Sequence, residues 1–145
     1  MSDTIQHVFL VGAKSLGAYG GYETFVNKLT EYHQNNPKIK YHVACKANGD
    51  GCMDETKLDG VTRISENEFE YHNAHCFKIP LPNIGSGQAI IYDTKALDYC
   101  CKYIKDNNIK HPIVYIMACR IGPWIAKYYK KIHDGVQVYR LLCNR

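Results

Sequence analysis

The sequence lacks several features that would define its class at once. It has no Cys-x-x-Cys pair, no internal repeat, no low-complexity segment, and no apolar run near the ~18 residues that a membrane span needs. Its seven cysteines are an odd number, and the opening residues show no signal-peptide pattern. We therefore expect a cytosolic protein with reduced thiols, in which the small core residues include Cys45, Cys100, Cys101 and Cys119.

The sequence gives little indication of nucleic-acid binding or of metal binding. The 18 lysines and arginines exceed the 14 acidic residues by only +4, which is too little to indicate nucleic-acid binding. His72, His75 and Cys76 form a metal-like cluster, but their spacing matches no standard zinc pattern, so we expect no metal. At 145 residues with 46% hydrophobic residues, the chain suits a single domain spanning residues 1–145.

Apolar periodicity predicts strands that alternate with helices. Such alternation favours β-α-β units and an α/β fold with a mostly parallel sheet. The strands are expected at residues 5–11, 40–45, 61–64, 68–71, 74–79, 113–117 and 136–141.

Three helices are expected between these strands. The first begins at Tyr22 and has an apolar face of Phe25, Leu29 and Tyr32, with Val26 and His33 beside them. The second has Asp93 as its N-cap. Its inner face is expected to be Ala96, Leu97, Cys100, Cys101 and Ile104. The third starts near Pro123 and is lined by Trp124, Ile125, Tyr128, Tyr129 and Ile132.

A glycine-rich loop joins the first strand to the first helix. Its glycines are Gly12, Gly17, Gly20 and Gly21. Glycines there allow a ligand to approach the backbone, and they leave the first N–H groups of the helix facing it. The loops at residues 12–21, from Lys46 onward, and at 118–122 should converge at the carboxyl edge of the sheet, where α/β proteins bind ligands. The alternative is that the glycines only form a tight turn.

Two common phosphate-binding motifs do not match this loop. A P-loop ends in Gly-Lys-Ser/Thr, whereas Lys14-Ser15 lies too early in the loop. The glycine spacing is not Gly-x-Gly-x-x-Gly, and the second strand ends in Cys45-Lys46 instead of an acidic ribose ligand. The sequence therefore argues against a dehydrogenase and against a P-loop kinase.

The segment from Tyr19 to Val26 resembles the Gly-Gly-x-Glu-Thr loop of family-4 glycosyltransferases, which have the GT-B fold. The likeness is closest to their rhamnosyltransferase-like subgroup from bacterial polysaccharide biosynthesis, and it covers residues 5–139. Three further segments resemble that subgroup, at residues 40–45, 111–115 and 117–123. The family usually has Gly-Leu/Ile-Pro where this chain has Ser15-Leu16-Gly17.

The resemblance implies a Rossmann-like, mostly parallel sheet with helices on both faces, forming one half of a GT-B fold. Residues 1–145 would be the N-terminal, acceptor-side domain, with the C-terminal donor domain absent. We accordingly expect an incomplete hexosyltransferase that is inactive alone, or whose C-terminal domain is a separate polypeptide. No catalytic base is evident, and the catalytic residues are unknown.

The resemblance also assigns substrate-binding residues, which lie in the expected edge loops and, for Glu23, in the first helical turn: Gly12, Lys14, Gly17, Tyr19, Gly20, Gly21, Glu23 and Arg120. Backbone N–H groups of Gly20 and Gly21 would stabilise the leaving diphosphate, and Lys14 or Arg120 would face phosphate. Glu23 would bind an acceptor hydroxyl, or it would act only on the helix dipole.

The expected ligands are a nucleotide-sugar donor, with rhamnose as a candidate sugar, and a polysaccharide or lipid-linked acceptor. No metal or other cofactor is expected, and no nucleic acid. The place would be the cytoplasm or the inner face of the plasma membrane, where Trp124 and Tyr128 would touch lipid; the alternative is a solvated helix face. Two further alternatives are a non-catalytic sugar- or phosphate-binding α/β module and a truncated, non-functional fragment.

Overall fold

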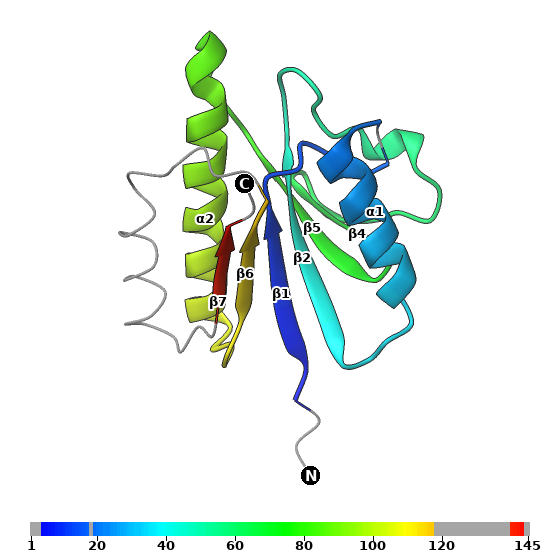
Figure 1. Ribbon diagram of the computed structural model, residues 1–145. Helices are drawn as coiled ribbons and strands as arrows, with labels where there is room; N and C mark the ends of the chain where they lie inside the picture. The colour runs from blue at the N-terminus through cyan, green and yellow to red at the C-terminus, as the bar shows by residue number, and fades with distance from the viewer. Residues whose placement is uncertain (1–3, 18, 118–139, 144–145) are drawn as a thin grey trace.

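The computed structural model describes residues 4–17, 19–117 and 140–143. They form an α/β fold, in which one mixed, mostly parallel sheet has the strand order β3-β4-β5-β2-β1-β6-β7 (Figure 1). The strands are β1 (Gln6–Val11), β2 (Ile39–Lys46), β3 (Thr62–Ser65), β4 (Glu68–Tyr71), β5 (Ala74–Ile79), β6 (Ile113–Ile116) and β7 (Arg140–Cys143).

The parallel strands form the centre of the sheet, and an antiparallel pair closes one side. β1 pairs in parallel with both β2 and β6, β2 pairs in parallel with β5, and β6 with β7. β3, β4 and β5 are antiparallel to one another in turn. The β4–β5 hairpin turns at His72 and Asn73, whose φ angles of 54° and 58° are typical of a two-residue hairpin turn.

Two α-helices in the described residues cover opposite faces of the sheet. They are α1 (Gly21–His33) and α2 (Gln88–Asp106). Side chains alternate along β1, so Phe9 and Val11 pack in the cluster that holds the inner face of α2, whereas Leu10 packs in the cluster that holds Val26 of α1. The expectation of helices on both faces of the sheet is therefore confirmed.

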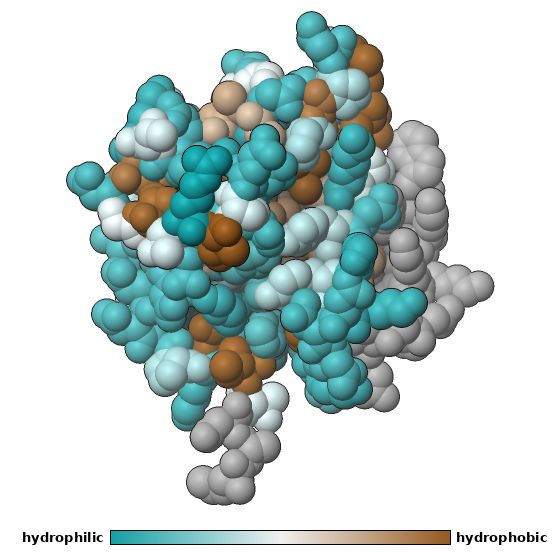
Figure 2. Space-filling view, turned by 180° about the vertical axis from the view of Figure 1, so that it is seen from behind, coloured by the Kyte–Doolittle hydropathy of each residue, from teal (hydrophilic) through white to brown (hydrophobic). Residues whose placement is uncertain are grey.

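Both helices begin at the edge to which the central strands point (Figure 1). This is the carboxyl edge, and the loops after β1, β2 and β5 meet there. Two short 3₁₀ helices also lie in these connections, at Glu55–Lys57 and Gly85–Gly87. Seen from behind, hydrophobic side chains form separate patches among hydrophilic ones (Figure 2), as is usual for a surface that faces water. None of the helices described has the length and apolar character required to cross a membrane.

The apolar face predicted for α1 is only partly correct: Val26 is buried and Leu29 packs against the core, but the large aromatic residues of that face do not. Val26 and Thr30 are the buried residues, whereas Phe25 and Tyr32 are 45% and 83% exposed. The helix turns small β-branched side chains toward the sheet, and Thr30 Oγ1 donates to the Val26 carbonyl at 2.9 Å. Phe25 points instead toward the side of β6, where its ring centroid lies 6.4 Å from that of Tyr115.

The second helix begins earlier than predicted. Asp93 is fully buried inside α2 and is not its N-cap, because the helix starts at Gln88 behind Gly87. The predicted inner face of α2 is confirmed, since Ala96, Leu97, Cys100, Cys101 and Ile104 are all buried. Cys45 is buried as expected. The helix expected from Pro123, Cys119 and the start of the strand expected at 136–141 lie outside the described residues; β7 is described from Arg140 onward.

Candidate binding site at the carboxyl edge

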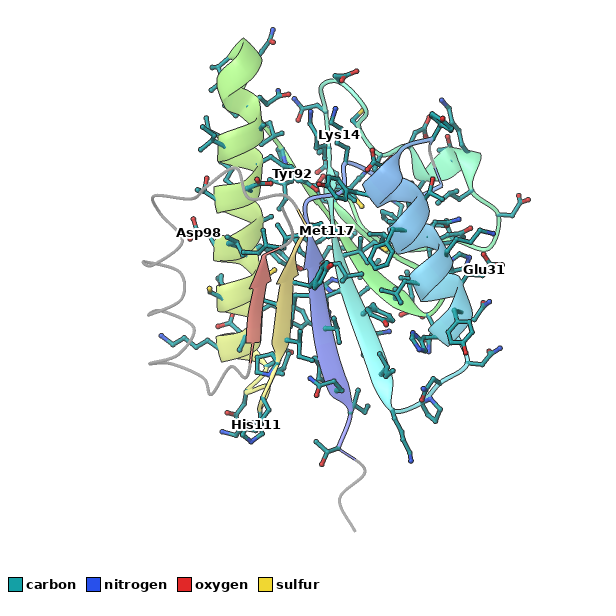
Figure 3. The ribbon with its side chains drawn as sticks, viewed as in Figure 1. Lys14, Glu31, Tyr92, Asp98, His111 and Met117 are labelled. Carbon is teal, nitrogen blue, oxygen red and sulfur yellow. The ribbon has the colours of Figure 1, made fainter. Side chains whose placement is uncertain are left out.

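The glycine loop follows β1 directly, and α2 holds it in place. The Tyr92 hydroxyl of α2 donates to the carbonyl of Ala13. Met117 continues β6 beside the loop, because its N–H donates to the Val11 carbonyl at 2.8 Å. Figure 3 shows Lys14, Tyr92 and Met117 near the carboxyl edge and His111 at the opposite edge. The loop is thus positioned by β1, by α2 and by the end of β6, which are distant from one another in sequence.

Three of the four glycines have backbone angles that a side chain would strain. Gly12, Gly17 and Gly20 have φ angles of 130°, 79° and 157°. A Cβ on Gly17 would lie 2.8 Å from Leu58 Cδ2. The alternative that glycines only shape a turn therefore accounts for these three.

Gly21 is different. Its φ is not in the positive region, and a Cβ built on it would meet nothing within 4 Å. It is the first residue of α1, and the first helical hydrogen bond runs from Thr24 N–H to the Gly20 carbonyl at 2.9 Å. The N–H groups of residues 21–23 precede that bond, and Gly20 has no side chain to cap them.

An open hollow of about 400 Å³ lies beside the start of α1. Its lining combines backbone, one carboxylate and apolar or aromatic side chains: Gly21, Tyr22, Glu23, Phe25, Tyr115 and Met117. Glu23 Oε1 also lies 2.7 Å from the position that a Gly20 Cβ would take, so the carboxylate folds back over the start of its own helix. Glu23 thus has a place both at the helix dipole and in the hollow.

The other predicted residues are spread along the edge. Tyr19 is fully exposed, and Gly17 lines a second, smaller hollow of about 150 Å³ with Ser15 and Met53. Lys14 Nζ lies 3.1 Å from Asp50 Oδ2, away from the residues that line the first hollow. Arg120 lies outside the described residues. Among the predicted residues, the structure brings Gly21 and Glu23 together in one hollow.

A group around Lys46 was not assigned from the sequence. Lys46 is 5% exposed, and its Nζ donates to the Asp50 carbonyl at 2.9 Å and to Gln88 Oε1 at 3.1 Å. Its backbone N–H donates to the Lys14 carbonyl at 2.8 Å. The signal that could have indicated this group is the Asn48-Gly49-Asp50-Gly51 turn directly after a predicted strand.

A second cluster of titratable groups, the histidine chain, crosses the buried sheet. It consists of His7, His42, His75 and Glu68, from four different strands. His7 Nδ1 lies 2.8 Å from His42 Nε2, His42 Nδ1 lies 2.9 Å from His75 Nδ1, and His75 Nε2 lies 2.9 Å from Glu68 Oε1. The Tyr99 hydroxyl also donates to Glu68 Oε1 at 2.6 Å.

The carboxylate fixes one donor of the histidine chain. Ionised Glu68 only accepts, so His75 donates to it from Nε2. Burial, followed by the neighbouring His75, His7 and Lys40, lowers the pKa of His42 to about 2. Hydrogen bonds from Tyr99 and His75 lower the pKa of Glu68.

Neither cluster has the arrangement of a metal site. In the ranges that the structure describes, no three His, Cys, Asp or Glu side chains are placed to hold a metal ion. His72 contacts Thr30 at 3.1 Å, whereas His75 belongs to the histidine chain. The metal-like cluster noted in the sequence therefore divides between two separate contacts.

A family model described as a domain of unknown function, DUF1972, matches residues 5–140. The chain belongs to this family. Searches of curated proteins and of solved structures each found no match. The DUF1972 match covers almost the whole chain, so the family assignment extends over both the carboxyl edge and the histidine chain.

Proposed function

We propose that this DUF1972 chain is a glycosyltransferase-like domain that binds a nucleotide-sugar and a glycan or lipid-linked acceptor at its carboxyl edge. In this proposal its sheet is the Rossmann-like, acceptor-side half of a GT-B fold. The support from sequence is the Gly20-Gly21-Tyr22-Glu23-Thr24 segment and its resemblance to family-4 glycosyltransferases. The support from structure is the hollow that this same segment lines.

The observation that carries the proposal is the open space at Gly21. Its glycine identity is explained neither by a positive φ nor by a close neighbour, unlike that of Gly17 or Gly20. A glycine at an exposed helical position is less stable than alanine by about 1 kcal/mol. A ligand that packs directly against the backbone of Gly21 explains why no side chain is present there.

The lining of the hollow suits a sugar. Sugars present apolar C–H faces and hydroxyl rims, so they bind to aromatic rings combined with a few polar acceptors. Tyr22, Phe25 and Tyr115 supply rings, and Glu23 supplies carboxylate oxygens that accept hydroxyl protons. The first N–H groups of α1, which precede its first helical hydrogen bond, would donate to an anionic leaving group as it forms.

The test compares Gly21→Ala with Gly87→Ala. Gly87 also has a negative φ, and its Cβ would make only an ordinary 3.5 Å contact with Ile84, so it is a matched control outside the hollow. Ligand-detected NMR would use dTDP-rhamnose, UDP-glucose and methyl rhamnoside as probes. We expect the sugar protons to give binding signals with the wild type and with Gly87→Ala. With Gly21→Ala these signals should be at least tenfold weaker.

Equal binding by Gly21→Ala and the wild type, with both folded, would contradict the proposal. Absence of binding by the wild type to all three probes would also contradict it. An assay for product from dTDP-rhamnose and a glycan acceptor then separates transfer from binding alone. Product formation supports the transferase, whereas binding without product favours a non-catalytic sugar-binding module.

A further inference from the structure

The second hollow, of about 150 Å³, lies between the glycine loop and the segment that leads into the first 3₁₀ helix. The loop contributes residues 15–17, and the segment contributes residues 52–54, 57 and 58. Lys14, directly before Ser15, marks this part of the loop in Figure 3. Pockets that enclose a drug-sized ligand have volumes of about 300 to 1,000 Å³. The second hollow is smaller, so it suits one substituent of a larger ligand.

Two adjacent residues of this hollow have hydrogen-bond donors with no oxygen partner among the described residues. Ser15 is only 3% exposed, and its hydroxyl has no hydrogen-bond partner there. The backbone N–H of Leu16 donates to the Met53 sulfur at 3.3 Å, and a thioether is a weak acceptor. A buried hydroxyl without a partner destabilises the fold. Both donors would therefore gain from an oxygen supplied by a ligand.

The rest of the lining combines apolar side chains with groups of opposite charge. Met53 and Leu58 pack in the core cluster beside α1. Asp54 Oδ1 accepts from the Thr56 N–H at 3.2 Å and from the Thr56 hydroxyl, and these hydrogen bonds lower the pKa of Asp54. Its Oδ2 makes no hydrogen bond within the described residues, so it is open to a donor. Lys57 is exposed beside it and offsets its charge, so the hollow suits an uncharged group.

We propose that the second hollow binds the acetamido group of an N-acetylated sugar. The acetamido oxygen would accept from the Ser15 hydroxyl and would replace the Met53 sulfur at the Leu16 N–H. The acetamido N–H would donate to Asp54 Oδ2, and the methyl group would pack on Leu58. A plain hydroxyl has no methyl group, and a carboxylate has no donor for Asp54.

This proposal deepens the proposed function, on which it rests for the ligand being a sugar acceptor. The glycine loop lines both hollows, since residues 15–17 belong to the second and Gly21 to the one beside α1. The two sugars of a transfer reaction have to meet, and a shared loop brings their sites to one edge of the sheet. The N-acetylated sugar therefore takes the place of the acceptor.

The first test compares three glycosides that differ only at carbon 2 of the sugar. They are methyl N-acetyl-β-glucosaminide, methyl β-glucosaminide and methyl β-glucoside. NMR titration of the whole chain would measure their affinities. We expect the N-acetylated compound to bind at least tenfold more tightly than the other two. It should also shift the amide signal of Leu16 and the methyl signal of Met53, a readout that needs no substitution.

The second test uses Ser15→Ala, for which binding and stability should respond differently. Loss of the hydroxyl removes one hydrogen bond to the ligand and should weaken binding of the N-acetylated compound about tenfold. The melting temperature should stay unchanged or rise, because the hydroxyl has no partner in the fold. Ser65→Ala is the control, since Ser65 is exposed on β3, outside the hollow, and should leave binding unchanged.

Three results would overturn the proposal. They are equal binding of the three glycosides, binding of the N-acetylated compound that Ser15→Ala leaves unchanged, and binding without shifts at Leu16 and Met53. A fall in the melting temperature of Ser15→Ala with unchanged binding would assign the hydroxyl to the fold.

Failure of this proposal and failure of the proposed function are distinguishable. A preference for the acetamido group that depends on Ser15, without any effect of Gly21→Ala on the rhamnose probes, retains the second hollow and rejects the site beside α1. Loss of rhamnose binding with Gly21→Ala, without a preference among the three glycosides, rejects the acetamido site alone.

Discussion

The carboxyl edge and the histidine chain are built on the same strands, yet they differ in how their polar groups are satisfied. In the histidine chain, hydrogen bonds of 2.8 to 2.9 Å join rings from three strands to the Glu68 carboxylate. At the carboxyl edge, the Lys14–Asp50 pair is solvent-exposed, and an open hollow lies beside the start of α1. The first region is a closed network, and the second leaves room for a ligand.

The difference follows from what covers each region. A polar group on the part of the sheet that a helix covers must find its partner inside the protein. Tyr99 and Tyr103 of α2 cover the histidine chain in this way, with Tyr103 stacked on His75 at 5.0 Å. At the strand ends, loop residues such as Asp50, whose side chain is 94% exposed, are in contact with solvent. We therefore expect the histidine chain to govern stability and the edge to govern binding.

The largest effect is expected from His42→Ala. The ring is 1% exposed, stacks on Phe9 at 4.3 Å and contacts two other histidines. Its loss leaves a cavity and two unsatisfied rings, so unfolding free energy should fall by about 3 kcal/mol in urea titrations at pH 7.5. Tyr32→Ala, at an 83% exposed position, should change it by less than about 0.5 kcal/mol. A loss with His42→Ala as small as that control would contradict the role of the histidine chain.

The pH dependence of stability should follow the same chain. Burial lowers the pKa values of His42 and His7, so unfolding takes up protons below the unfolded value of 6.5. Stability is complete above pH 6.5 and should decrease as the pH falls toward 5, by at most about 1.4 kcal/mol per pH unit for each histidine. Glu68, whose pKa is lowered from 4.5, acts only at lower pH.

NMR measures the protonation of the His42 ring directly. The His42 ring should remain neutral through pH 5 in the folded protein. Titration of its ring signals near pH 6.5 while the protein stays folded would show that the chain is open to solvent, and the contrast with the carboxyl edge would fail.

An intermediate effect is expected from neighbouring glycines of the loop. Gly20→Ala places a side chain at a φ of 157° and should destabilise the protein by about 1 to 2 kcal/mol. Gly21→Ala should leave stability unchanged or slightly higher, because nothing lies near its Cβ. Thermal unfolding of the two variants in parallel is the measurement. Equal melting temperatures would indicate that Gly20 carries no backbone strain.

The smallest effect is expected at the Lys14–Asp50 pair. Neither Lys14→Gln nor Asp50→Asn should move the urea midpoint beyond experimental error, since a surface ion pair adds little. Unchanged stability in both variants, beside the loss expected from His42→Ala, separates the two regions. A large stability loss from either variant would place the pair with the structural network instead.

Much of the fold was predictable because it depends on local patterns. Apolar runs predicted β1, β2, β5 and β6, and the inner face of α2 was confirmed at all five residues. The face of α1 was only partly predictable: Val26 and Leu29 do pack on the core, but Phe25 and Tyr32, which have the same helical spacing, are exposed. Asp93 was misassigned because an acidic residue suits an N-cap in sequence, whereas α2 starts five residues earlier.

Less of the candidate site was predictable. The glycine loop and its place at the sheet edge came from the residue pattern, and Gly21 and Glu23 do line a hollow. Tyr115 and Met117 were not assigned to it, since they follow the loop by about ninety residues and reach it only through the β1–β6 pairing. The lysine group needed β2 and the start of α2 to meet, which no local pattern records.

The sequence alone determined the alternation of strands and helices, the placement of the glycine loop and the four-glycine composition that indicates a ligand edge. These follow from periodicity and from backbone preferences, which act between near neighbours. Tertiary structure decided which glycine is unexplained by the backbone, which lysine is buried and which histidines meet. Such contacts depend on strand order, and strand order joins residues that are distant along the chain.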